Sequence, residues 1–122
     1  MKFYICKHCG KVITVLNEVN VPTICCGEPM EEIVGNTTDA ALEKHVPVVE
    51  QTENKVLVKV GEVEHPMTEE HYIEWIVVET ENQTYLQKLQ PNQKPEATFM
   101  IQEPVLRAYA YCNLHSLWKK EM

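Results

Sequence analysis

Four of the five cysteines lie at the start of the chain and restrict how that part can fold. They form a Cys6-x-x-Cys9 pair and an adjacent Cys25–Cys26 pair. A segment such as residues 1–36 is too short to bury a core that stands alone, so a bound metal is the natural staple. Zinc and iron both accept four thiolates. The sequence therefore predicts a tetrathiolate metal module and leaves zinc or iron open.

The spacing within each pair has its own consequence. Two residues between Cys6 and Cys9 let the backbone turn so that both sulfurs face one ion. Cys25 and Cys26 point apart in extended chain, so both can bind one ion only where the backbone bends. His8 lies inside the first pair, but with four sulfurs available it is interpreted as a solvated loop residue. Disulfides or free thiols are the lesser alternative for these cysteines, because an odd cysteine count without a signal peptide favours metal thiolates.

The periodicity of the chain is that of strands almost throughout. Short β-branched or aromatic runs, bounded by Gly, Pro, Asn or Gln, predict strands at 3–5, 12–16, 46–50, 55–60, 72–79, 84–89, 97–101 and 105–111. No window carries a helical stripe longer than about two turns. We therefore expect an all-β chain, with the metal module at 1–36, a β-sandwich domain at 37–122 and the connection near 34–39.

A second group of potential metal ligands is scattered over the predicted sandwich: His45, His65, His71, Cys112 and His115. Cys112-x-x-His115 is the most informative part, because its gap can place two ligands on one ion. Four imidazoles and one thiolate are more ligands than a structural zinc site normally takes. Iron accepts that set and keeps a sixth position for chemistry. This group favours a reactive iron centre.

Composition excludes several classes of function. Eighteen acidic against eleven basic residues give a formal charge of −7, which argues against a nucleic-acid partner. No apolar run approaches the ~20 residues of a membrane span, and no signal peptide precedes Cys6. We expect a cytoplasmic protein that binds neither nucleic acid nor membrane.

In their order along the chain, these motifs resemble the desulfoferrodoxin family, the two-iron form of superoxide reductase. The resemblance runs from Cys6 to about Trp118. It includes Cys-x-x-Cys, Cys-Cys-Gly-Glu-Pro-Met from Cys25, Glu-Lys-His-Val-Pro from Glu43, His65-Pro66-Met67, His-Tyr-Ile-Glu-Trp from His71, and Cys-Asn-Leu-His from Cys112. The ordered set is specific, although each member alone is weak.

The resemblance implies two iron ions per chain. Cys6, Cys9, Cys25 and Cys26 would hold a rubredoxin-like iron in a desulforedoxin module. His45, His65, His71 and His115 would surround the second iron, with Cys112 as its axial thiolate. The resemblance also implies an immunoglobulin-like sandwich, a homodimer and an external electron donor such as rubredoxin.

The activity implied is one-electron reduction of superoxide to hydrogen peroxide. By resemblance, Lys44 draws the anion towards the second iron, and Glu43 occupies the sixth position once that iron is ferric. Three alternatives stay open: an iron electron carrier with a saturated second site, a zinc-stapled binding module, and a dismutase that also releases dioxygen. The first iron could be an electron relay or only a structural staple. Trp75 and Trp118 are expected to pack around the site.

Overall fold

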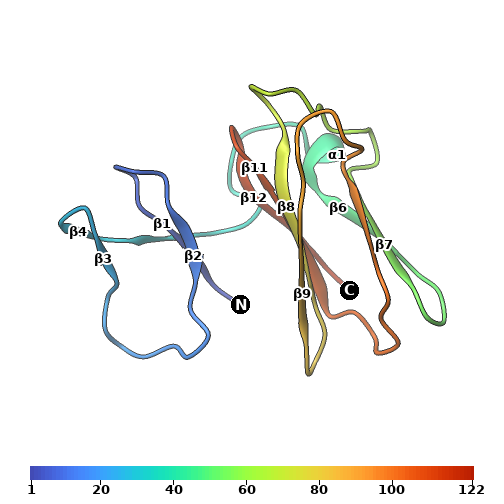
Figure 1. Cartoon of the computed structure of the whole chain (residues 1–122), viewed down its shortest axis with the longest axis horizontal. Coiled ribbons are helices and arrows are strands. Elements are labelled where there is room, and N and C mark those ends of the chain that lie inside the picture. Colours follow the sequence, from blue (N-terminus) through green and yellow to red (C-terminus); the bar gives the residue numbers. More distant parts are fainter. The chain divides into compact units, whose positions relative to one another are not determined.

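The computed structural model describes residues 1–122 and divides into two compact units, Met1–Val34 and Gly35–Met122. The only helix is α1 (Leu42–His45), and every other element is a strand, which confirms the all-β prediction. In the first unit, which we call the cysteine module, the strands are β1 (Phe3–Ile5), β2 (Val12–Thr14), β3 (Ile24–Cys25), β4 (Glu28–Pro29) and β5 (Glu31–Ile33). They form a β2-β1-β5 sheet and a separate β3–β4 hairpin (Figure 1).

The second unit is a sandwich of two antiparallel sheets (Figure 1). One sheet has the order β10-β7-β6, from β10 (Glu96–Phe99), β7 (Val56–Val60) and β6 (Pro47–Gln51). The other has the order β12-β11-β8-β9, from β12 (Ser116–Glu121), β11 (Arg107–Cys112), β8 (Ile73–Glu79) and β9 (Thr84–Lys88). Strand order and alternating inward residues are those of an immunoglobulin-like sandwich, as predicted.

The core between the two sheets is aliphatic, and its strands contribute alternate side chains. β7 follows this period, with Val56, Val58 and Val60 all buried. From the facing sheet, Ile76 and Ala110 are fully buried. Cys112 belongs to the same buried cluster, so the strand that closes the core also carries a sulfur to one end of it.

Pairing between β11 and β8 changes register next to that sulfur. Tyr111 lies opposite Trp75, but Cys112 lies opposite Ile73, so Glu74 is an extra residue on β8. Such a bulge bends a strand and redirects the side chains beside it. It ends the regular ladder where the strand meets the second group of candidate ligands.

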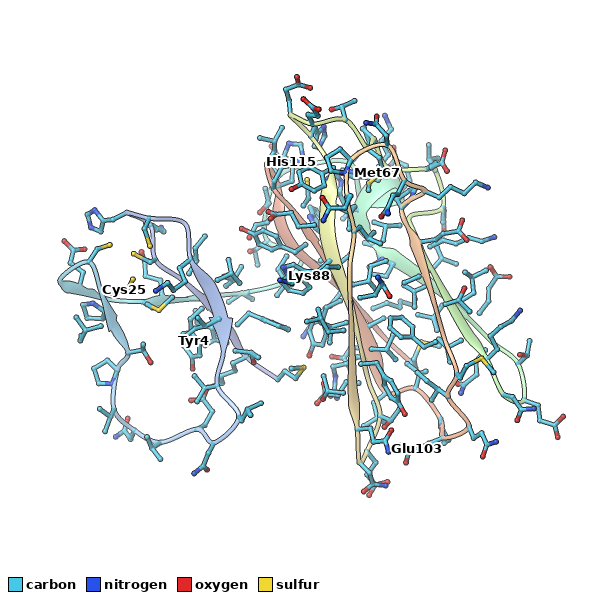
Figure 2. All side chains as sticks on the ribbon, viewed as in Figure 1. Tyr4, Cys25, Met67, Lys88, Glu103 and His115 are labelled. Carbon is cyan, nitrogen blue, oxygen red and sulfur yellow. The ribbon has the colours of Figure 1, made fainter.

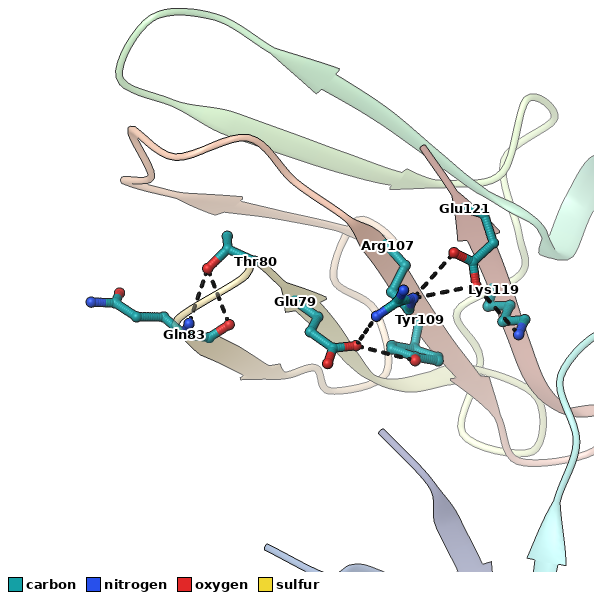
Figure 3. A network of polar contacts seen from close by, with 7 residues as sticks. All are labelled: Glu79, Thr80, Gln83, Arg107, Tyr109, Lys119 and Glu121. Atoms are coloured by element: carbon teal, nitrogen blue, oxygen red, sulfur yellow. Dashed lines mark hydrogen bonds and ion pairs between the residues drawn. The ribbon is translucent and has the colours of Figure 1, made fainter.

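An ion-pair network stabilises the opposite end of β11 (Figure 3). The Arg107 guanidinium donates to Glu79 at 2.8 Å and to Glu121 at 3.1 Å, and the Tyr109 hydroxyl donates to Glu79. These residues lie on β8, β11 and β12, so the network ties three neighbouring strands together. It lies five residues along β11 from Cys112, the strand's last residue.

Several elements were not predicted. β12 ends in three charged residues, Lys119-Lys120-Glu121, which are typical of an edge strand. Because of these charges, the segment lacks the apolar alternation by which strands are predicted. β3, β4 and β5 have two or three residues each, and α1 is a single turn. Unlike the similarly short β1 and β2, the strands β3, β4 and β5 lack a run of β-branched or aromatic residues, so the sequence carries no strand signal there.

Candidate metal centres

The first candidate centre lies in the cysteine module, where two turns bring four sulfurs together (Figure 2, near Cys25). Gly10 N–H donates to the Cys6 carbonyl at 2.8 Å and closes the first turn. The second turn joins β3 to β4, with Cys26 and Gly27 at φ +53° and +78°. Positive φ at both central residues is typical of a type I′ hairpin. It supplies the bend that two adjacent cysteines need in order to converge.

The spacing of these sulfurs fits a tetrahedral metal. All four lie within 4.8 Å of one another, and Cys9 and Cys25 are 3.7 Å apart. Metal–sulfur bonds of about 2.3 Å would place the corners of a tetrahedron about 3.8 Å apart. His8 is excluded from the group and instead pairs with Glu28 at 3.2 Å in solvent, as expected for a loop residue.

The pKa values of these thiols show why a cation is needed. Hydrogen bonding from the Cys9 backbone lowers the pKa of Cys6 to about 6. Hydrogen bonding to Cys6 raises the pKa of Cys25 to about 12. Adjacent thiols cannot all ionise, because each thiolate disfavours the next. A bound cation removes that restriction, so the donor set fits a tetrathiolate metal.

The second candidate centre lies at one end of the sandwich, where Figure 2 labels His115 and Met67, opposite the end labelled Glu103. Its five residues come from four places. His45 ends α1, while His65 and His71 lie in the segment between β7 and β8. Cys112 ends β11, and His115 lies in the turn that leads into β12. All five residues of the predicted second constellation are thereby brought together.

The four imidazoles stand at the corners of a square. Going round in the order His45, His65, His71, His115, neighbouring ring centroids are 4.6, 4.6, 5.1 and 5.0 Å apart, and the planes are nearly perpendicular. The diagonal from His45 to His71 is 6.5 Å. The four sides and this diagonal are close to those of a square, an arrangement in which the rings surround one central point.

Hydrogen bonds orient the nitrogens of two rings towards that point. His45 Nδ1 donates to the Ala41 carbonyl and His65 Nδ1 to the Pro66 carbonyl, both at 2.7 Å. A carbonyl only accepts, so each Nδ1 carries the hydrogen and each Nε2 carries a lone pair. The two Nε2 atoms are 3.2 Å apart, and His115 Nδ1 is also 3.2 Å from His45 Nε2.

Such a set of lone pairs fits a metal ion. Two lone pairs at 3.2 Å repel unless a cation lies between them. Metal–nitrogen bonds of about 2.1 Å at right angles would place neighbouring nitrogens about 3 Å apart. His71 Nε2 is buried and has no hydrogen-bond partner, which a metal bond would provide. The Nε2 atom of His71 therefore lacks a partner, and the Nε2 atom of His65 faces the lone pair of His45. A metal ion between the rings would satisfy all three nitrogens.

Burial keeps the imidazoles of His45, His65 and His71 neutral. It lowers the pKa of His65 to about 4 and also lowers the pKa values of His45 and His71. Neutral rings retain the lone pairs that a metal requires. The one sulfur of this centre, Cys112, is fully buried, and burial raises the pKa of its thiol, opposed by the backbone N–H groups of Leu114 and His115.

Lys44 and Glu43, the two predicted catalytic residues, precede His45 on α1 and are exposed. The Lys44 charge contributes to lowering the pKa values of both His45 and His71, so its ammonium lies within electrostatic range of two corners of the square. The Glu43 carbonyl accepts from Val63 N–H at 2.8 Å, which ties α1 to the segment carrying His65.

Close packing of the backbone holds α1 in place. A Cβ added to Gly61 would lie 2.7 Å from the Glu43 carbonyl oxygen and 3.0 Å from that of Val46. Only glycine permits this approach. The position of His45 at the end of α1 therefore depends on Gly61. The sequence spacing of the candidate ligands gave no indication of this residue.

Trp118 contacts two members of the square. Its indole stacks on His45 at 4.7 Å, and its Nε1–H donates to the His115 carbonyl at 3.0 Å. It is fully buried. Trp75 instead stacks on Tyr111 at 5.3 Å on the neighbouring strand. Both tryptophans were expected to pack around the site. Trp118 contacts two of the candidate ligands directly, whereas Trp75 stacks on Tyr111, the residue before Cys112.

Comparison with known families identifies the chain. The desulfoferrodoxin family model matches residues 37–121, and the model of the desulfoferrodoxin N-terminal domain matches residues 1–33. The chain belongs to the desulfoferrodoxin family. The four-cysteine group and the histidine–cysteine group are consistent with the two iron centres of a desulfoferrodoxin.

Relatives of this desulfoferrodoxin match it over nearly its whole length. The desulfoferrodoxin of Syntrophotalea carbinolica is 46% identical over 99% of this chain and 96% of its own. That of Nitratidesulfovibrio vulgaris is 46% identical over 98% and 95%. Among solved structures, the superoxide reductase from Treponema pallidum is 36% identical, with a TM-score of 0.81, over 99% of this chain and all of its own. No helix in the present structure has the length and hydrophobicity to cross a bilayer.

Proposed function

We propose that this desulfoferrodoxin is a superoxide reductase that converts superoxide to hydrogen peroxide at its histidine–cysteine centre. The observation that carries the proposal is the square of four imidazoles beside a fully buried cysteine. When bound there, ferrous iron supplies the one electron that, with two protons, turns superoxide into hydrogen peroxide. The similarity to the Treponema pallidum superoxide reductase supports the same activity.

The charge of the donor set favours an anionic substrate. The imidazoles of His45, His65 and His71 are neutral at pH 7, because burial lowers their pKa values. Cys112, as a thiolate, then contributes the only negative charge of the set, and a divalent ion leaves a net charge of +1. In a chain of net charge −7, that local charge matters for drawing superoxide in.

Lys44 adds to this local field. Its ammonium is exposed to solvent and within electrostatic range of His45 and His71. We assign it to superoxide capture and to holding the water that delivers protons. Glu43, its neighbour on α1, is assigned as the carboxylate that would bind the iron in its ferric form.

The remaining partners follow from the same proposal. Each turnover needs one electron from outside, and a small protein such as rubredoxin is the proposed donor. The cysteine module exposes Leu16, Val19, Val21 and Ile24, with Leu16 96% exposed, and such apolar surface supports the proposed homodimer. The five free thiols support a reducing, cytoplasmic location.

Stoichiometry of the products tests the proposal. Anaerobic, ferrous-loaded protein is mixed with one equivalent of superoxide while the visible spectrum, peroxide and dioxygen are measured. Peroxide without dioxygen, together with a new thiolate-to-ferric absorption band, is the expected result. Dioxygen released with peroxide would indicate a dismutase instead, and an unchanged spectrum would favour the electron carrier.

A further inference from the structure

The ring of His71 is held differently from the rings of His45 and His65. The rings of His45 and His65 are each fixed by a 2.7 Å bond from Nδ1 to a backbone carbonyl. The His71 ring makes no such bond, and its Nε2 is buried without a partner. His71 is also less buried than His45 and His65, which are 3% and 2% exposed. Something other than its own ring must therefore set its position.

The Asn113 side chain brackets His71. Asn113 Nδ2 donates to the Glu70 carbonyl at 2.9 Å, and Tyr72 N–H donates to Asn113 Oδ1 at 2.9 Å. Asn113 N–H also donates to the Tyr72 carbonyl at 3.2 Å. The carboxamide thus binds the residue before His71 and the residue after it. Its two bonds hold the backbone on both sides of His71, while Thr68 bonds to the N–H and the carbonyl of His71 itself.

Asn113 follows Cys112 directly, so this bracket ties the backbone of one candidate ligand to that of another. We propose that Asn113 is a positioning residue that holds His71 in the imidazole square at a set distance from Cys112. Its side chain acts through the backbone on either side of His71 and not as a metal ligand. The inference rests on the metal centre of the proposed function, but not on reaction with superoxide.

Gln51 offers a matched control in the same sandwich. Its Nε2 donates to the Glu103 carbonyl at 2.8 Å, and Val105 N–H donates to its Oε1 at 3.2 Å. This carboxamide brackets residue 104 as Asn113 brackets His71. It acts near Glu103, at the end of the sandwich opposite His115 (Figure 2). Gln51→Ala therefore removes the same pair of bonds without touching the metal centre.

The test uses the full chain loaded with cadmium, a diamagnetic ion that accepts more than four nitrogen and sulfur ligands, so that ring ¹⁵N resonances report each histidine separately. In the unaltered chain, His71 Nε2 should show the shift of a metal-bound nitrogen. In Asn113→Ala, the His71 signal alone should broaden or move towards that of free imidazole. In a chelator titration followed through the histidine ring signals, the affinity of this centre for cadmium should be about 10–100-fold lower in Asn113→Ala. Gln51→Ala should change neither readout.

The proposal is overturned if Asn113→Ala keeps a sharp, metal-bound His71 signal and the cadmium affinity of Gln51→Ala. Should Asn113→Ala not fold, Asn113→Asp carries the test, because it keeps the acceptor for Tyr72 N–H and replaces the donor to the Glu70 carbonyl. A loosened His71 signal in that variant supports the proposal, and an unchanged one overturns it. Cadmium binding is independent of superoxide chemistry, so failure of the proposed activity would leave this result standing.

Discussion

Replacing Trp118 by phenylalanine should destabilise the sandwich by about 2–4 kcal/mol. Phenylalanine keeps an aromatic ring over His45 but loses the Nε1–H that donates to the His115 carbonyl at 3.0 Å. Leaving that acceptor without its partner costs about 1–3 kcal/mol. Trp118 is fully buried, and a cavity of roughly 40 Å³ adds about 1 kcal/mol at ~24 cal/mol per Å³.

Trp118→Leu separates the stack from the hydrogen bond. It also removes the ring over His45, which is worth about 0.5–1.5 kcal/mol, so its loss should exceed that of Trp118→Phe. Urea unfolding of the metal-free, reduced chain, followed by circular dichroism, measures both variants. A loss below about 0.5 kcal/mol for Trp118→Phe would refute the reasoning, because a buried donor–acceptor pair cannot be removed so cheaply.

Three further predictions concern charge and metal. Lys44→Ala should slow the second-order reaction with superoxide by up to about tenfold, and added salt should shrink the difference from the unaltered chain; equal rates at low salt would remove Lys44 from substrate capture. The Arg107 guanidinium lowers the pKa of Glu121 in the folded chain. The stability gained from this ion pair is therefore complete above the pKa of an unfolded glutamate and is lost as pH falls through the lower folded value. Arg107→Met should flatten this acid-side fall in the urea midpoint, and an equally steep fall would contradict the assignment. A chelator that strips both metals should unfold the cysteine module and leave the sandwich folded, as amide hydrogen exchange would show. Amides in the module that stay protected would mean that its hydrophobic core holds it folded without a metal.

The cysteine module was the easiest part to predict, because its ligands are close in sequence. Cys6-x-x-Cys9 carries its geometry in its spacing, and Cys25–Cys26 left only a bend to be found, which Cys26 provides at φ +53°. The sandwich strands were also predictable from their alternation. β12 was not, because its last residues are charged.

The histidine–cysteine centre was predictable as a set of residues, but its construction was not. His45 and His115 lie 70 residues apart and meet only through the strand order of the sandwich. Asn113 stands inside the Cys-x-x-His motif, yet its role depends on backbone groups about 41 residues earlier in the chain. Spacing between ligands reports which side chains can share an ion, whereas the contacts that hold those side chains depend on tertiary structure.

Those contacts have a property in common that bears on the proposed chemistry. The groups that hold the imidazoles are neutral: the Ala41 and Pro66 carbonyls, the Trp118 indole and the Asn113 carboxamide. Metal-binding histidines often donate to a carboxylate instead, and each carboxylate would subtract one unit of charge beside the metal. If the ring N–H groups of His45 and His65 donated to two carboxylates instead of two carbonyls, a centre of net charge +1 would fall to −1 and would repel superoxide. Neutral partners orient the rings equally well and preserve the positive field that an anionic substrate requires in a chain of net charge −7.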